Sequence, residues 1–219
     1  MSSLDLAQAV IFIAMFVLVA GPVHECAHAY TAWKLGDGTA RLFGRISLDP
    51  IRHFDPIGGT FLIASVMLGA VAGSPFGFGW AKPTPVNPLN LRGRYADSMV
   101  AVAGPLSNLG LAVICGIGFR IVNLHPDNTS LPHMVALVLF TGIELNVALM
   151  LFNLIPIAPL DGSHVLLDLL DQRTAQSVRT FMNQYGFMLL VFVVLLAGRI
   201  IVPVLVPIVN FLAGARILA

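Results

Sequence analysis

Residues 6–33 read LAQAVIFIAMFVLVAGPVHECAHAYTAW, a run without lysine or arginine. A helix needs about 20 predominantly apolar residues to cross a bilayer, so this run predicts a membrane-spanning helix. No basic residue precedes residues 6–20, and the apolar pattern continues beyond them, so we expect the segment to be retained rather than cleaved as a signal peptide. Gly21-Pro22 interrupts the run and predicts a kink whose freed carbonyl groups are satisfied inside the protein.

The composition of the whole chain agrees with a membrane protein. Of its 219 residues, 57% are hydrophobic and 11% are charged, and the mean hydropathy is +0.87. Soluble domains usually contain about 25% charged residues, so most soluble classes are excluded. With this apolar composition, we expect the lipid bilayer as a partner. The formal net charge is only +1, so we expect no nucleic acid as a partner.

The remaining pattern predicts an all-α polytopic membrane protein with about five to six membrane segments. After the first helix, the expected helical segments are 95–122, 133–154, 160–170, a polar surface helix 172–184 and a bent membrane helix 187–213. Between the first helix and the next full span, residues 36–51 alternate in a way that predicts a small β-hairpin. The short apolar stretch 56–72, followed by a Gly/Pro-rich stretch, predicts a re-entrant or half-crossing region.

Basic residues predict the orientation in the membrane. If residues 56–88 dip in and return, nine of the twelve lie on one side: Lys34, Arg41, Arg45, Arg52, Lys82, Arg92, Arg94, Arg173 and Arg179. By the positive-inside rule that side is cytoplasmic, and the N-terminus lies outside. If residues 56–72 crossed the membrane fully, these basic residues would lie on both sides of it. The positive-inside rule therefore favours a region that enters the membrane and returns to the same side.

His24-Glu25-Cys26-Ala27-His28 is an H-E-x-x-H motif on the first helix. Residues four apart lie on one helix face, so both imidazoles can bind one metal ion, and Glu25 can reach water bound to that ion. Two imidazoles and a carboxylate suit zinc. The alternative is a helix whose histidines only hydrogen-bond to neighbours. Burying two histidines and a glutamate in an apolar segment without a cation would be costly, which favours the metal.

A catalytic zinc site needs a third protein ligand, with the fourth position left to water. The candidates are Glu144, Asp161, His164 and the loop residue His53. Asp161 stands out because the proline-containing stretch 153–162 breaks one helix and starts another, which lets the carboxylate project from an irregular turn. Asp161 can also cap the following helix, and the two roles can coexist.

Four motifs together resemble the site-2 proteases, a family of intramembrane zinc metalloproteases. They are HECAH at 24–28, AGPLSN at 103–108, NLIPIAP at 153–159 and LDG at 160–162. The stretches 53–58 and 79–88 are similar to the compact bacterial branch, which lacks a PDZ or CBS domain. The resemblance covers roughly residues 4–170, and the order and spacing of the motifs agree as well as their content.

The resemblance implies that His24, His28 and Asp161 bind one Zn²⁺ ion and that Glu25 is the catalytic acid/base. It implies a single intramembrane metalloprotease domain, 1–219, with a catalytic core over about 4–170 and the C-terminal helices over 172–219. Such an enzyme is a zinc metalloendopeptidase of regulated intramembrane proteolysis, located in the inner (plasma) membrane. The expected substrate is a transmembrane helical protein, such as an anti-sigma factor or a signal peptide remnant.

Three further polar residues are expected near the substrate. Asn108 and Asn153 can contact the scissile carbonyl or the substrate backbone, because an amide offers both donors and an acceptor. Interhelical hydrogen bonding is the alternative for both. His53 is expected either to gate the substrate or to be a plain interfacial histidine. The edge of the hairpin over 36–51 is expected to pair with the unwound substrate.

Two other functions would use the same residues. A zinc transporter or sensor needs no glutamate beside a ligand, and it would usually show polar groups across the whole bilayer. An inactive scaffold is disfavoured because His24, Glu25, His28 and Asp161 are all intact. Glu144 lies nine residues before Asn153, too far along its helix to join the site, so we expect it either to stay protonated or to pair with Arg199.

Overall fold

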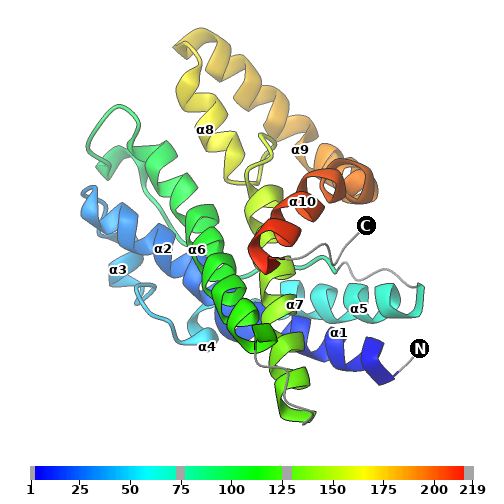
Figure 1. The fold of residues 1–219 in the computed structure, drawn as a ribbon. Helices are drawn as coiled ribbons and strands as arrows, with labels where there is room; N and C mark the ends of the chain where they lie inside the picture. The colour runs from blue at the N-terminus through cyan, green and yellow to red at the C-terminus, as the bar shows by residue number, and fades with distance from the viewer. Residues whose placement is uncertain (1–2, 73–76, 125–129, 215–219) are drawn as a thin grey trace.

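The computed structural model describes residues 3–72, 77–124 and 130–214, and it is helical with no β-strand among these residues (Figure 1). The elements are α1 (Ser3–Met15), the π-helix η1 (Phe16–Ala20), α2 (Gly21–Lys34), α3 (Thr39–Leu42), α4 (Pro50–His53), α5 (Pro56–Ala72), the 3₁₀-helix η2 (Pro88–Asn90), α6 (Ala96–Leu124), α7 (Ser130–Asn153), α8 (Gly162–Leu169), α9 (Gln172–Ile200) and α10 (Val202–Ala213). The predicted all-α class is therefore confirmed for the described residues.

The first membrane helix is continuous through α1, η1 and α2. Gly21-Pro22 does not break it, because the N–H of Gly21 donates to the carbonyl of Phe16, five residues earlier, in a π-helical turn. This wider turn comes just before Pro22, which has no N–H to donate. The irregular turn therefore ends immediately before the part of α2 that holds His24 and His28.

Four helices of the described chain are long and apolar enough to cross a membrane: Leu6–Lys34, Ala96–Val122, His133–Asn153 and Gln172–Ile200. Pro56–Gly69 and Val202–Ala213 are shorter apolar helices. The predicted count of five to six segments is not confirmed. Residues 172–184 do not form a separate surface helix, since α9 continues to Ile200 and the break before α10 falls at Ile201.

α7 lies at the centre of the helical bundle (Figure 1). Its residues Ile143 and Val147 are fully buried in a cluster with α6 and α10, whereas Leu145 is buried in a second cluster with α1, η1 and α5. A helix that is apolar on all sides is stable when other helices surround it. α7 therefore joins the first membrane helix to α6, against which α2 also packs.

The β-hairpin predicted over 36–51 is wrong. The short helices α3 and α4 occupy this stretch instead. Gly44, in the left-handed conformation with φ +66°, follows the end of α3, and the Asp49 side chain caps α4 by accepting the N–H of Ile51. These local signals for helix ends outweigh an alternation of only a few residues. The expected pairing of substrate with a hairpin edge therefore loses its basis.

The chain doubles back on itself between α4 and η2. After α5, it comes back as a non-helical stretch, residues 77–87, which we call the return segment. The N–H of Phe78 donates to the Ser65 hydroxyl (2.7 Å), which donates to the Phe78 carbonyl (2.9 Å), so the segment runs back along α5. The N–H of Lys82 then donates to the carbonyl of His53 (2.7 Å), so the chain returns to the level at which α5 began.

Candidate metal centre

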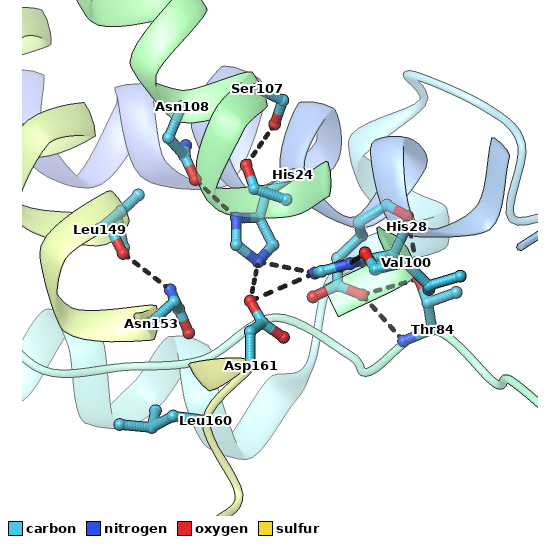
Figure 2. A network of polar contacts seen from close by, with 12 residues as sticks. His24, His28, Thr84, Val100, Ser107, Asn108, Leu149, Asn153, Leu160 and Asp161 are labelled. Carbon is cyan, nitrogen blue, oxygen red and sulfur yellow. Dashed lines mark hydrogen bonds and ion pairs between the residues drawn. The ribbon is translucent and has the colours of Figure 1, made fainter. Parts of the chain in front are cut away.

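Three side chains from two distant parts of the chain converge beside α6 (Figure 2). His24 and His28 come from α2, and Asp161 comes from the turn between α7 and α8. The two imidazole Nε2 atoms are 3.0 Å apart, and Oδ2 of Asp161 lies 3.3 Å from Nε2 of His24 and 3.4 Å from Nε2 of His28. Both histidines are buried, and this group is the cluster in the described chain that could hold a metal ion.

A chain of amide hydrogen bonds fixes which nitrogen of His24 is protonated. Nδ2 of Asn146 donates to the carbonyl of Gly142 (2.8 Å), and Nδ2 of Asn108 donates to Oδ1 of Asn146 (2.9 Å). Oδ1 of Asn108 therefore faces Nδ1 of His24 at 2.5 Å. Because a carbonyl oxygen only accepts, Nδ1 of His24 carries the proton. Its Nε2 then presents a lone pair to the cluster.

His28 is oriented in the same way by the main chain of α6. Its Nδ1 lies 2.7 Å from the carbonyl oxygen of Val100, to which it donates. In the neutral imidazoles that bind a metal ion, Nε2 of His28 also presents a lone pair, so that two lone pairs and a carboxylate oxygen face one another. Oδ2 of Asp161 is buried and has no hydrogen-bond partner among the described residues.

The donor set fits a zinc ion. Three electron-rich atoms that converge without a proton between them are costly unless a cation satisfies them. Tetrahedral zinc, with bonds of about 2.0–2.1 Å to nitrogen and oxygen, places neighbouring ligand atoms roughly 3.3–3.4 Å apart. The separations of 3.0, 3.3 and 3.4 Å among the three atoms are close to that spacing.

Gly104 on α6 leaves the space that an ion bound by these three side chains would need. A Cβ at this position would lie 2.6 Å from Nε2 of His24 and closer still to Nε2 of His28. Non-bonded carbon and nitrogen atoms do not approach so closely, so any side chain at position 104 would displace the imidazoles or fill the space between them. The glycine of the AGPLSN motif thus gives α6 its close approach to the histidines.

Asp161 is held in place by α8. It precedes that helix but makes no side-chain capping hydrogen bond, so its carboxylate stays available to the imidazoles. α8 is tied to the start of α6, where Asp168 accepts hydrogen bonds from the N–H (3.0 Å) and hydroxyl (2.7 Å) of Ser98. His164 also contacts Asp97 at 2.8 Å, and this hydrogen bond to a carboxylate raises the pKa of the His164 imidazole.

Glu25 is held by the return segment. The N–H of Thr84 donates to Oε2 of Glu25 (2.8 Å), and the Thr84 hydroxyl lies 2.7 Å from the same oxygen. The hydroxyl is also 3.0 Å from the main-chain oxygen of Glu25. The carboxylate next to His24 is therefore fixed by groups from a distant part of the chain.

The other predicted site residues, Asn108, Asn153 and His53, are not members of the three-residue cluster. Asn108 is fully buried, and both ends of its amide have protein partners, so its position favours orienting His24 over contacting a substrate. Asn153, at the end of α7, donates to the carbonyl of Leu149 (3.0 Å) (Figure 2). His53 is 1% exposed, its Nε2 contacts the carbonyl of Ser47 (2.7 Å), and it is not one of the three residues of the cluster.

Glu144 lies outside the cluster, as its spacing predicts. Nε2 of Gln8 donates to its Oε2 at 3.4 Å, which links α7 to α1. Within the described chain, Glu144 forms no ion pair. Its partner is therefore an amide rather than Arg199.

Three residues that shape the centre are not among those predicted from the sequence. Asn146 lies seven residues before Asn153 and thus on a similar face of α7, a spacing that could have suggested a polar partner for Asn108. Gly104 belongs to a recognised motif, but only its distance to the imidazoles shows its role. Thr84 has no local sequence feature that links it to Glu25.

Comparisons with known proteins agree with this arrangement. The family model described as peptidase family M50 matches residues 119–197, which include Asp161. The chain is 38% identical over 208 residues to "Putative zinc metalloprotease YwhC" of Bacillus subtilis strain 168, which covers 89% of this chain and 85% of the relative. It is 30% identical over 186 residues to "Putative zinc metalloprotease Rip2" of Mycolicibacterium smegmatis, which covers 82% and 67%. No solved structure gives a significant match.

The first of these alignments extends over most of both chains, so the resemblance does not rest on short motifs alone. Together with the four apolar helices long enough to cross a membrane, it identifies a multi-pass membrane protein. The chain therefore belongs to peptidase family M50, the site-2 metalloprotease family that its motifs resemble.

Proposed function

We propose that this chain is a zinc metallopeptidase that hydrolyses a peptide bond within or near a transmembrane helix of another protein. The observation that supports this most is the buried convergence, beside Glu25, of two imidazole nitrogens and one carboxylate oxygen that has no hydrogen-bond partner among the described residues. His24, His28 and Asp161 would hold the zinc ion, which leaves a fourth position for water or substrate. Glu25 follows His24 directly in the chain and forms no ion pair within the described residues.

The chain's own contribution to the chemistry is proton transfer by Glu25. Zinc bound in the centre supplies a Lewis acid that polarises the scissile carbonyl and lowers the pKa of water to about 7. The Glu25 carboxylate takes a proton from the water whose oxygen bonds to the carbonyl carbon. It then gives this proton to the amide nitrogen as the carbon–nitrogen bond breaks, which releases an amine and a carboxylic acid.

The position of the centre along α2 supports cleavage inside the membrane near one surface. Lys34 ends α2 six residues after His28, which corresponds to about 9 Å of helix. The N–H of Arg92 donates to the carbonyl of Leu35 (2.8 Å), so the basic residues before α6 lie at the same end. By the positive-inside rule this end is cytoplasmic in the plasma membrane, and the N-terminus is outside.

A substrate at this depth has to be a membrane helix that unwinds locally. The backbone of a transmembrane helix is satisfied by its own hydrogen bonds, so its peptide bonds are not accessible until a turn opens. Asn153 has no hydrogen bond to Oδ1 within the described chain, so this oxygen can accept a backbone N–H of the opened turn. A membrane-anchored anti-sigma factor or a signal peptide remnant is a substrate of this kind, cleaved in regulated proteolysis.

Removal of the metal tests the proposed function. The purified chain is reconstituted into liposomes with a labelled single-span helix that contains helix-breaking residues near one end. We expect cleavage to be lost after treatment with 1,10-phenanthroline and restored by zinc but not by magnesium, because imidazole ligands suit zinc. A zinc-sensitive dye inside the same liposomes reports transport. Zinc entry without cleavage of any helix would contradict a peptidase and favour a transporter.

A further inference from the structure

Thr84 stands outside the metal centre, yet both of its hydrogen-bond donors are directed to Glu25. Its N–H and its hydroxyl reach the same carboxylate oxygen, Oε2, at 2.8 and 2.7 Å. Oε1 of Glu25 accepts no hydrogen bond from the described residues. One oxygen of the carboxylate is therefore held, and the other remains available to take a proton.

We propose that Thr84 is a positioning residue that holds Glu25 in the orientation needed for proton transfer. This inference rests on the proposed peptidase function. A glutamate side chain has several rotatable bonds, so an unheld carboxylate populates many orientations. Carboxylates are also zinc ligands, so an unheld Glu25 beside His24 would compete for the coordination position that catalysis leaves to water. The hydrogen bonds from Thr84 limit the orientations of the Glu25 carboxylate, and they keep it from occupying the coordination position that is left to water.

The return segment is itself anchored where it bears Thr84. The buried guanidinium of Arg45 donates to the carbonyls of Lys82 (3.0 Å) and Pro83 (2.8 Å), immediately before Thr84. Lys82 also donates its N–H to His53 (2.7 Å). These bonds leave Thr84 little freedom to move away from Glu25.

A second anchor follows Thr84. The N–H of Asn87 donates to Oδ2 of Asp37 (2.7 Å), and the side chain of Asn90 donates to Oδ1 of the same carboxylate (3.1 Å). Asp37 is fully buried. A threonine held from both sides is a rigid donor, and rigid donors position catalytic groups better than mobile ones.

Three variants test the role of the Thr84 hydroxyl. Thr84→Val removes the hydroxyl but keeps the shape and the main-chain N–H, and Thr84→Ser keeps the hydroxyl. Thr60→Val is the matched control, because the Thr60 hydroxyl donates only within α5, to the carbonyl of Pro56 (2.8 Å). Each protein is measured in liposomes with the labelled single-span helix for kcat, KM and zinc content.

We expect kcat of Thr84→Val to fall about 10- to 100-fold, because small displacements of a catalytic group have effects of this size. KM and zinc content should stay at the wild-type values, Thr84→Ser should recover most of kcat, and Thr60→Val should match the wild type. Wild-type kcat in Thr84→Val, equal losses in Thr84→Val and Thr84→Ser, or loss of zinc in Thr84→Val would overturn the positioning role. Failure of the proposed function itself is distinguishable, because then the wild-type protein would not cleave.

Discussion

Replacement of Glu25 by glutamine is expected to abolish cleavage while the zinc ion stays bound. Glutamine has nearly the same shape, and its carbonyl oxygen can still accept the hydrogen bonds that Thr84 donates. It cannot take a proton from water, so both proton transfers are lost. General acid–base groups contribute about 10²- to 10⁴-fold to rate, and we expect kcat to fall by at least that range. Cleavage and zinc content are measured on the same preparation.

The chain offers a matched control for this variant. Glu25 and Glu144 are its two glutamates, and Glu144 lies on a membrane helix away from the metal centre with Gln8 as its partner. Glu144→Gln should therefore retain wild-type cleavage and zinc. Full cleavage by Glu25→Gln would show that another group transfers the proton. Loss of zinc from Glu25→Gln would show instead that Glu25 is a ligand.

Gly104→Ala is expected to prevent zinc binding, although alanine at this position should stabilise helix α6. Alanine is preferred over glycine in a helix interior by about 1 kcal/mol, so α6 itself should gain stability. The added methyl group, however, would lie 2.6 Å from Nε2 of His24 and closer to Nε2 of His28. Those imidazoles cannot easily retreat, because their Nδ1 atoms are held by Asn108 and Val100. We expect zinc content and cleavage to fall at least about tenfold, as measured by elemental analysis and the liposome assay.

Gly110→Ala on the same helix is the control for Gly104→Ala. A Cβ at Gly110 would have no neighbour within 4 Å, so this variant should keep both zinc and activity. If Gly104→Ala binds zinc as well as the wild type does, then the ion does not occupy the space between α6 and the two imidazoles. If both variants lose zinc, the loss reflects a general effect on α6 rather than the contact at position 104.

The features that the sequence predicts well are those determined by residues close to one another in the chain. His24 and His28 are four residues apart, so one helix brings their imidazoles to one face without any tertiary information. The stretch around Asp161 contains prolines that end α7, and an irregular turn there follows from the sequence. The spans 96–122 and 133–153 follow from apolar length alone.

The features that the sequence does not predict depend on contacts between residues far apart in the chain. Thr84 meets Glu25 only because the return segment folds back beside α5, and no pattern within the segment encodes that contact. Asn146 completes the hydrogen bonds behind His24 only because α7 packs against α6. A short alternation predicts a hairpin over 36–51, whereas Gly44 after α3 and Asp49 before α4 determine the local structure there.

Zinc-edge X-ray absorption on the purified chain tests most directly whether His24, His28 and Asp161 hold the ion. The structure predicts about one zinc ion per chain, with only nitrogen and oxygen neighbours at about 2.0–2.1 Å and the scattering pattern of two imidazoles. Asp161→Asn should weaken zinc binding without adding a new kind of ligand. A sulfur neighbour at about 2.3 Å, which Cys26 within the motif could supply, or a chain that binds no zinc would contradict the proposed centre.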